Sequence, residues 1–197
     1  IKAMDDIGLL ENIFPELYKN KTIPPNVKTL NHLEKLLLNP NQINAKPIKD
    51  IKKIILDKSQ LIKLGFLLYP LAQKSSSNKI GSSHKTIRKT KVSKILAELR
   101  ASNADIDFVN STIICAHSLS NTKFSFTKDL SSQATLYQLI YQNEQALIPG
   151  LFIYLANRPN LPTSKEWKID ADATKARYIL KFYFQTYLPA KRKEPLL

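Results

Sequence analysis

The stretch from His84 to His117 constrains the fold most strongly, because its apolar residues recur at the spacing of helix faces. A first stripe predicts one helix and consists of Ile87, Val92, Ile95 and Leu99. A second stripe predicts another helix and consists of Ile106, Val109, Ile113 and Ala116. The two helices are expected to join at residues 101–103, with Ser102 as N-cap and Asp105 as an acidic first-turn residue.

Glycine is scarce, with four residues in a chain of 197, which argues against a sheet-rich fold with many tight turns. Helical spacing recurs elsewhere, so the sequence predicts an all-α fold, an irregular bundle of about nine helices. Residues 61–69 are nearly continuously apolar, and we expect them to form a core helix that Ser59 caps and Pro70 kinks or ends. Pro149 and Gly150 are expected to interrupt a helix, and Pro189 to end the last one, which runs from about residue 173 to 188.

The chain is strongly basic, with 30 Lys and Arg against 16 Asp and Glu, a net charge of +14. Between Asp57 and Glu98 there are nine basic residues and no acidic one. A surface of one sign attracts polyanions, so RNA or DNA is the expected partner. The alternative is a lysine-rich surface that only keeps the protein soluble.

Cys115 is the only cysteine and lies in an apolar run, so we expect a buried small side chain. A disulfide within the chain is excluded, which fits a reducing cytoplasm. We expect no membrane partner, because no apolar run approaches the roughly 18 residues of a bilayer span and no secretory signal is present. The chain begins at Ile1 in the middle of a helical pattern, so we expect it to be part of a longer protein.

Five short segments follow one another in an order that a known family shares. They are GLLENIFPEL at 8–17, LLYPLAQK at 67–74, Gly81 to His84 with Ser93 and Ile95-Leu96 after it, LRASN at 99–103 continuing to His117, and KEPLL at 193–197. In these segments the chain resembles the C-terminal part of the bacterial tRNA nucleotidyltransferase/poly(A) polymerase family, in which a helical neck and body separate a catalytic head from a tail. The resemblance covers most of residues 1–120 and the extreme C-terminus.

The resemblance implies a neck-like helical segment at 1–40 and a helical body at 41–197, with the catalytic head and the tail absent. It also implies a parent enzyme that adds nucleotides from nucleoside triphosphates to RNA 3′ ends with Mg²⁺. Both cofactors would belong to the missing head, so none is expected in this chain. The expected partners are tRNA or another structured RNA and the head of the same protein.

The basic residues would then lie along the sugar–phosphate backbone of a structured RNA such as a tRNA acceptor stem, reading phosphate and shape rather than bases. The candidate RNA-binding residues are Lys74, Lys79, Lys85, Arg88, Lys89, Lys91 and Arg100. Three aromatic residues could stack on bases, but their helical spacing favours the core; they are Tyr178, Phe182 and Tyr183.

The chain departs from the family where many members carry the His-Asp metal ligands of a phosphohydrolase. Tyr69 and Pro70 stand there, and neither can replace an imidazole or a carboxylate as a metal ligand. We interpret His84 and His117 as histidines hydrogen-bonded at helix ends, in a degenerate region of the phosphohydrolase (HD) type at about 48–120. No metal and no phosphohydrolase activity are expected; a metal hydrolase would need a metal at both histidines. A scaffolding or regulatory helical domain is the alternative to RNA binding.

Nucleotidyl transfer needs carboxylates that hold magnesium ions. Asp105 with Asp107 and Asp170 with Asp172 have a suitable spacing, but neither pair follows a phosphate-binding loop on a strand. We therefore expect no catalytic residue in this chain. The sequence leaves open whether the parent adds CCA, part of CCA or a poly(A) tail.

Overall fold

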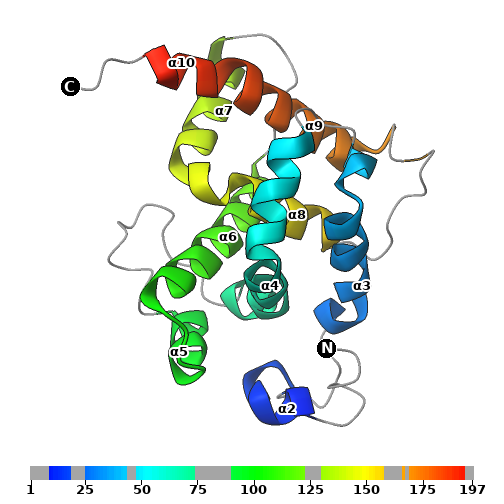
Figure 1. The fold of residues 1–197 in the computed structure, drawn as a ribbon, viewed down its shortest axis with the longest axis vertical. Helices are drawn as coiled ribbons and strands as arrows, with labels where there is room; N and C mark the ends of the chain where they lie inside the picture. The colour runs from blue at the N-terminus through cyan, green and yellow to red at the C-terminus, as the bar shows by residue number, and fades with distance from the viewer. Residues whose placement is uncertain are drawn as a thin grey trace.

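The computed structural model describes residues 9–18, 25–43, 48–73, 90–122, 130–157, 166 and 169–193. Within these ranges every regular element is a helix, which confirms the all-α class (Figure 1). The elements are α2 (Leu9–Ile13), η1 (Pro15–Leu17), α3 (Pro25–Leu38), η2 (Pro40–Ile43), α4 (Ile48–Gln73), α5 (Lys91–Glu98), α6 (Asn103–Asn121), α7 (Leu130–Asn143), η4 (Glu144–Ala146), α8 (Leu147–Ala156), α9 (Ala171–Phe182), the π turn η6 (Tyr183–Tyr187) and α10 (Leu188–Lys193). In this described part, seven α-helices have eight residues or more, fewer than the sequence predicts.

Helix α8 forms the centre of the molecule. Its sequence, LIPGLFIYLA, carries no charge, and nine of its ten residues are buried. It packs against α3, α4, α6 and α9, and Figure 1 shows it between α6 and α3 with α4 in front. A helix that is apolar on all sides can be surrounded in this way, so the other helices are attached to one shared core.

A close contact between α6 and α8 explains the glycine in the centre of the core. A Cβ atom added to Gly150 would lie 2.7 Å from both Cβ and Sγ of Cys115. Cys115 is fully buried, as expected, and burial raises the pKa of its thiol. The predicted interruption at Pro149 and Gly150 is wrong, because Pro149 occupies the first turn of α8, where its missing N–H is tolerated.

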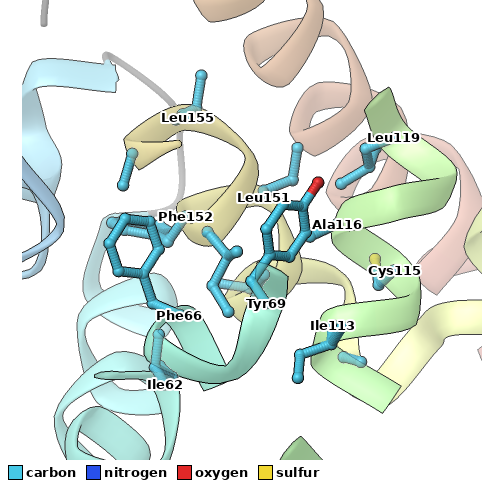
Figure 2. Packing of buried hydrophobic residues seen from close by; sticks show 14 of the residues in the cluster. Ile62, Phe66, Tyr69, Ile113, Cys115, Ala116, Leu119, Leu151, Phe152 and Leu155 are labelled. Atoms are coloured by element: carbon cyan, nitrogen blue, oxygen red, sulfur yellow. The ribbon is translucent and has the colours of Figure 1, made fainter. Parts of the chain in front are cut away.

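Helix α4 is a single helix of 26 residues that begins at Ile48, well before the predicted cap at Ser59. Ser59 lies inside it rather than at a cap, because the buried stripe of Ile55 and Ile62 continues past the serine. Pro70 does not stop the helix, which runs one more turn to Gln73. The predicted core position of residues 61–69 is confirmed, and Figure 2 shows Phe66 and Tyr69 among the side chains of α6 and α8.

The C-terminal helix also continues past a proline that the sequence predicts to end it. Pro189 lies in the first turn of α10, directly after the π turn η6. The wider π turn relieves the clash that a proline makes with the preceding turn of an α-helix. No helix of the described ranges has both the length and the apolar character to cross a lipid bilayer.

Candidate nucleic-acid interface

Two of the seven predicted RNA-binding residues belong to the part of the chain that the structure describes. Lys91 is the first residue of α5 and Arg100 follows its C-terminal end; both are exposed, as is Lys94 one turn after Lys91. We call Lys91, Lys94 and Arg100 the α5 basic surface. It lies near one end of the long axis of the molecule (Figure 1). The other five predicted residues lie outside the described residues and are Lys74, Lys79, Lys85, Arg88 and Lys89.

A buried polar network fixes the start of α5 against α6. Thr90 is the N-cap, and its hydroxyl oxygen accepts a hydrogen bond from Ser93 N at 3.1 Å. The Thr90 hydroxyl donates to Asn110 Oδ1 at 3.1 Å, and Asn110 Nδ2 donates to Ser93 Oγ at 3.0 Å and to Ile106 O at 2.8 Å. Because Ser93 and Asn110 are buried, the network holds α5, and Lys91 with it, in one position on α6.

The sequence predicts the α5–α6 junction correctly. Helix α5 begins at Lys91, after the predicted stripe residue Ile87, which lies outside the described residues. Ser102 caps α6, accepting from Asp105 N at 3.2 Å and donating to Asp105 Oδ2 at 2.7 Å. The Asp105 carboxylate is thus a helix-capping group beside the α5 basic surface. Leu99 leaves the predicted stripe and is 44% exposed, because the helix already ends at Glu98.

Arg100 occupies a backbone conformation that favours glycine. Its φ angle is 57°, and among the described residues no other non-glycine residue has a positive φ. The Arg100 N–H bonds to Ala97 O at 2.9 Å and the Ala101 N–H to Leu96 O at 3.0 Å, the two bonds of a Schellman C-cap. An arginine in the left-handed region costs roughly 1 kcal/mol relative to glycine. Its side chain must therefore be explained by something other than the stability of the turn.

A second basic group approaches this end of α6 from α4. The Lys58 ammonium lies 5.6 Å from the centre of the Phe108 ring, within reach of a cation–π contact. Phe108 lies in the second turn of α6 and packs partly against the core. Positive charge from α4 is therefore held near the α5–α6 junction, although the prediction did not include Lys58.

Tyr69 of α4 packs directly on His117 of α6. The rings of Tyr69 and His117 stack with centroids 4.2 Å apart and an interplanar angle of 12°. The Tyr69 hydroxyl lies 3.3 Å from Ser120 Oγ, which donates to Ala116 O. Burial lowers the pKa of His117, while a hydrogen bond with the Tyr69 backbone raises it. The tyrosine ring fills the position beside the imidazole, which does not fit a metal ligand set.

No three His, Cys, Asp or Glu side chains of the described ranges gather in a group that could hold a metal ion, and His84 lies outside those ranges. The second acidic pair has structural partners. Asp170 is the N-cap of α9 and accepts from Ala173 N at 2.7 Å, and Asp172 accepts a hydrogen bond from the Tyr154 hydroxyl. These contacts place both carboxylates at the start of a helix, as first-turn charges that stabilise it.

Lys175 of α9 has a structural role. The Lys175 ammonium donates to the carbonyl oxygens of Leu119 and Thr122 at the end of α6 and lies 5.1 Å from the centre of the Tyr154 ring. Burial lowers the pKa of Lys175. A lysine at a helix C-terminus stabilises the last carbonyl groups, so Lys175 fastens α9 to α6.

The exposed aromatic residues of the described part lie on α7, and the three that the sequence assigns to the core do pack there. Tyr183 is buried, and Tyr178 and Phe182 pack partly against the core, as their spacing predicts. Two tyrosines of α7 are exposed instead, Tyr137 at 37% and Tyr141 at 69%. Helical spacing could have found them, because the buried face of α7 consists of Leu136, Leu139 and Ile140 and each tyrosine follows one of these residues.

No protein-family model matches the chain, and neither a characterised protein nor a solved structure shows significant similarity to it. The features of the chain that point to a function are therefore its own exposed residues, in particular the α5 basic surface and the tyrosines of α7.

Proposed function

We propose that this chain binds the sugar–phosphate backbone of a structured RNA, such as a tRNA, through the α5 basic surface. It would serve as the neck and body of a template-independent RNA nucleotidyltransferase, and it would hold the RNA while a separate catalytic head extends the 3′ end. Magnesium and the nucleoside triphosphate would bind to that head. The chain alone is expected to add no nucleotides, because three of the four paired carboxylates, Asp105, Asp170 and Asp172, are engaged in helix capping or in a hydrogen bond from Tyr154.

The observation that carries this proposal is the conformation of Arg100. A glycine would satisfy the same C-cap without strain, yet the chain places an exposed guanidinium there. Guanidinium groups bind phosphate with two parallel hydrogen bonds, and a turn between two anchored helices holds such a group in a fixed place. Strain that is kept at one exposed cation favours a binding role for that cation.

The distribution of charge supports the same conclusion. Lys91 and Lys94 are exposed on one helix, one turn apart, and the helix is fixed by the Thr90–Asn110 network. One acidic residue of α5, Glu98, is also exposed, and the next along the chain, Asp105, has a carboxylate that accepts a hydrogen bond from Ser102. Exposed cations on a rigid element suit contacts to phosphate, which fix the position of a nucleic acid without reading its sequence.

The test compares two double charge reversals that change the net charge equally. Lys91→Glu with Lys94→Glu alters the α5 basic surface; Lys49→Glu with Lys52→Glu alters two exposed lysines with the same spacing near the start of α4. For a tRNA transcript, we expect the first variant to bind at least about tenfold more weakly, and its plot of log affinity against log salt to be shallower by about 2. The control variant should lose much less affinity.

Equal losses in the two variants would show that only the net charge matters, and unchanged affinity in both would contradict the proposal. A chain that binds tRNA without salt dependence, or not at all, would favour the second candidate, a helical scaffolding or regulatory domain. The Tyr69–His117 stack supports that candidate, since a tyrosine ring packed on the imidazole leaves an aromatic contact there in place of a pair of metal ligands.

A further inference from the structure

We propose that the exposed face of α7, together with α10, binds single-stranded RNA by stacking bases on Tyr141 and Tyr137. This inference rests on the proposed function and assigns the unpaired part of the RNA to a second surface. Figure 1 shows α7 and α10 together near the opposite end of the molecule from α5, and α7 packs against η6, which leads into α10. One RNA could thus contact both ends of the body, its structured part at α5 and its unpaired part at α7.

Helix α7 differs from the rest of this basic chain because none of its fourteen residues is charged. Its exposed positions carry hydroxyl, amide and phenol groups and include Ser131, Thr135, Tyr137, Gln138, Tyr141 and Gln142. Phenol rings stack on bases of any sequence, and amides and hydroxyls can bond to the edges of unpaired bases. Single-stranded RNA presents the faces and edges of its unpaired bases to such groups, whereas duplex RNA conceals the base faces within the stack.

Tyr137 is held by an aromatic cluster beneath it. The ring of Tyr137 lies 5.1 Å from that of Tyr187, which is buried and lies 5.8 Å from Tyr183. The Tyr187 hydroxyl donates to Glu144 Oε2 at 3.0 Å, and burial together with Glu144 raises the pKa of Tyr187. Tyr141 lies one turn from Tyr137 on the same side of α7, so its exposed ring stands beside the ring that the cluster supports.

Positive charge borders the tyrosines on α10. Lys191 and Arg192 are exposed, and Lys191 Nζ donates to both oxygens of Glu144, at 2.8 and 2.6 Å. Glu144 is the one acidic residue between positions 130 and 157, and this ion pair offsets its charge. A phosphate that follows a base stacked on Tyr141 would therefore meet a neutral ion pair and the exposed Arg192 of α10 rather than a free carboxylate.

A second copy of this chain fits the face less well. Two copies, each of net charge +14, repel one another, and stable interfaces between copies are usually apolar at their centre. Here the exposed glutamines Gln138 and Gln142 flank Tyr141, and the buried apolar residues of α7 face inward. The charge and the chemistry of the face both favour a polyanion with neutral planar groups.

The experiment measures binding of a fluorescein-labelled oligoadenylate of about ten nucleotides, within the range that single-strand binding surfaces cover. Tyr141 is the residue to vary, because its exposure makes a folding defect unlikely to confuse the result. We expect Tyr141→Ala to bind the oligonucleotide about tenfold more weakly, Tyr141→Leu equally weakly, and Tyr141→Phe as tightly as the wild type, since stacking needs the ring but not the hydroxyl. Affinity for a tRNA acceptor-stem duplex should not change in any of the three.

The same set of variants separates failure of this inference from failure of the proposed function. If all variants keep the wild-type affinity for both RNAs, the α7 face is not the binding site, while the α5 proposal stands. If neither RNA binds even the wild type, both proposals fail. Sedimentation of the free chain tests whether a second copy of the chain binds this face instead. Self-association that Tyr141→Ala abolishes would assign the face to a second copy and overturn the inference.

Discussion

The α5 end and the α7 end of this molecule are both exposed, but they offer different chemistry. At the α5 end, lysines and a strained arginine stand on a helix that a buried polar network holds in place. At the α7 end, an uncharged helix exposes two tyrosines above an aromatic cluster. The difference teaches that one basic chain can carry two kinds of surface for the same polymer, one suited to phosphates and one to bases.

The largest expected effect on stability comes from a substitution in the core that joins the two ends. Gly150→Ala forces a methyl group to within 2.7 Å of Cys115 Cβ and 3.2 Å of the Thr112 carbonyl oxygen, so α6 and α8 must separate. We expect the free energy of unfolding to fall by about 2 kcal/mol, measured by urea denaturation, because overpacking outweighs the higher helix propensity of alanine. Since α6 and α8 support both ends, binding at both should weaken near the unfolding temperature.

Gly65→Ala is the matched control, a second glycine inside a buried helix. Its added Cβ would meet Ile153 Cδ1 at 3.3 Å, the far end of a side chain that can rotate away. This variant should be neutral or more stable by up to about 1 kcal/mol. Equal destabilisation of the two variants would mean that α6 and α8 do not pack as closely as described.

A smaller change should affect the α5 end alone. Asn110→Ala removes the amide that connects Thr90, Ser93 and α6, and we expect a loss of about 1–2 kcal/mol of unfolding free energy. Amide hydrogen exchange should rise in α5 but not in α7. Asn143→Ala, which removes a single bond to Leu139 O in α7, is the control and should cost less than about 1 kcal/mol. Faster exchange throughout the chain would contradict a local role for the network.

His117 should make the free energy of unfolding depend on pH. Burial lowers its pKa below the value of 6.5 that an unfolded histidine has, so the unfolded chain binds the proton more tightly. Stability should therefore decline as the pH falls below about 6.5, by less than about 1.4 kcal/mol per pH unit, the limit for one proton. His117→Phe, which keeps a ring against Tyr69, should remove this part of the dependence. Identical pH profiles for the two proteins would contradict it.

The sequence predicts the helical class, the buried thiol, the α5–α6 junction and its cap, because spacing and capping are local properties. It fails at Pro149 and Pro189, which it predicts to interrupt or end a helix and which instead lie in the first turns of α8 and α10. At Pro70, α4 continues for one more turn rather than ending. Tertiary packing decides such cases, and propensity alone cannot.

The candidate sites divide in the same way. Net charge can be counted, so the basic segment is visible in the sequence, whereas the strain at Arg100 and the exposure of Tyr141 exist only in the folded chain. The stack of Tyr69 on His117 joins residues that are far apart in the sequence, so no local pattern reveals it.

Arg100→Gly provides the most direct test of the central claim, that the α5 basic surface is kept for RNA at the expense of stability. We predict opposite signs in two measurements on one protein. The free energy of unfolding should rise by about 0.5–1 kcal/mol because the left-handed strain is removed, while affinity for a tRNA transcript falls and its salt slope decreases by about 1. Arg100→Lys should keep the strain and the salt slope but lose part of the affinity, because an ammonium group cannot bind a phosphate with two parallel hydrogen bonds. A glycine variant that is more stable and binds tRNA as tightly as the wild type would contradict the account.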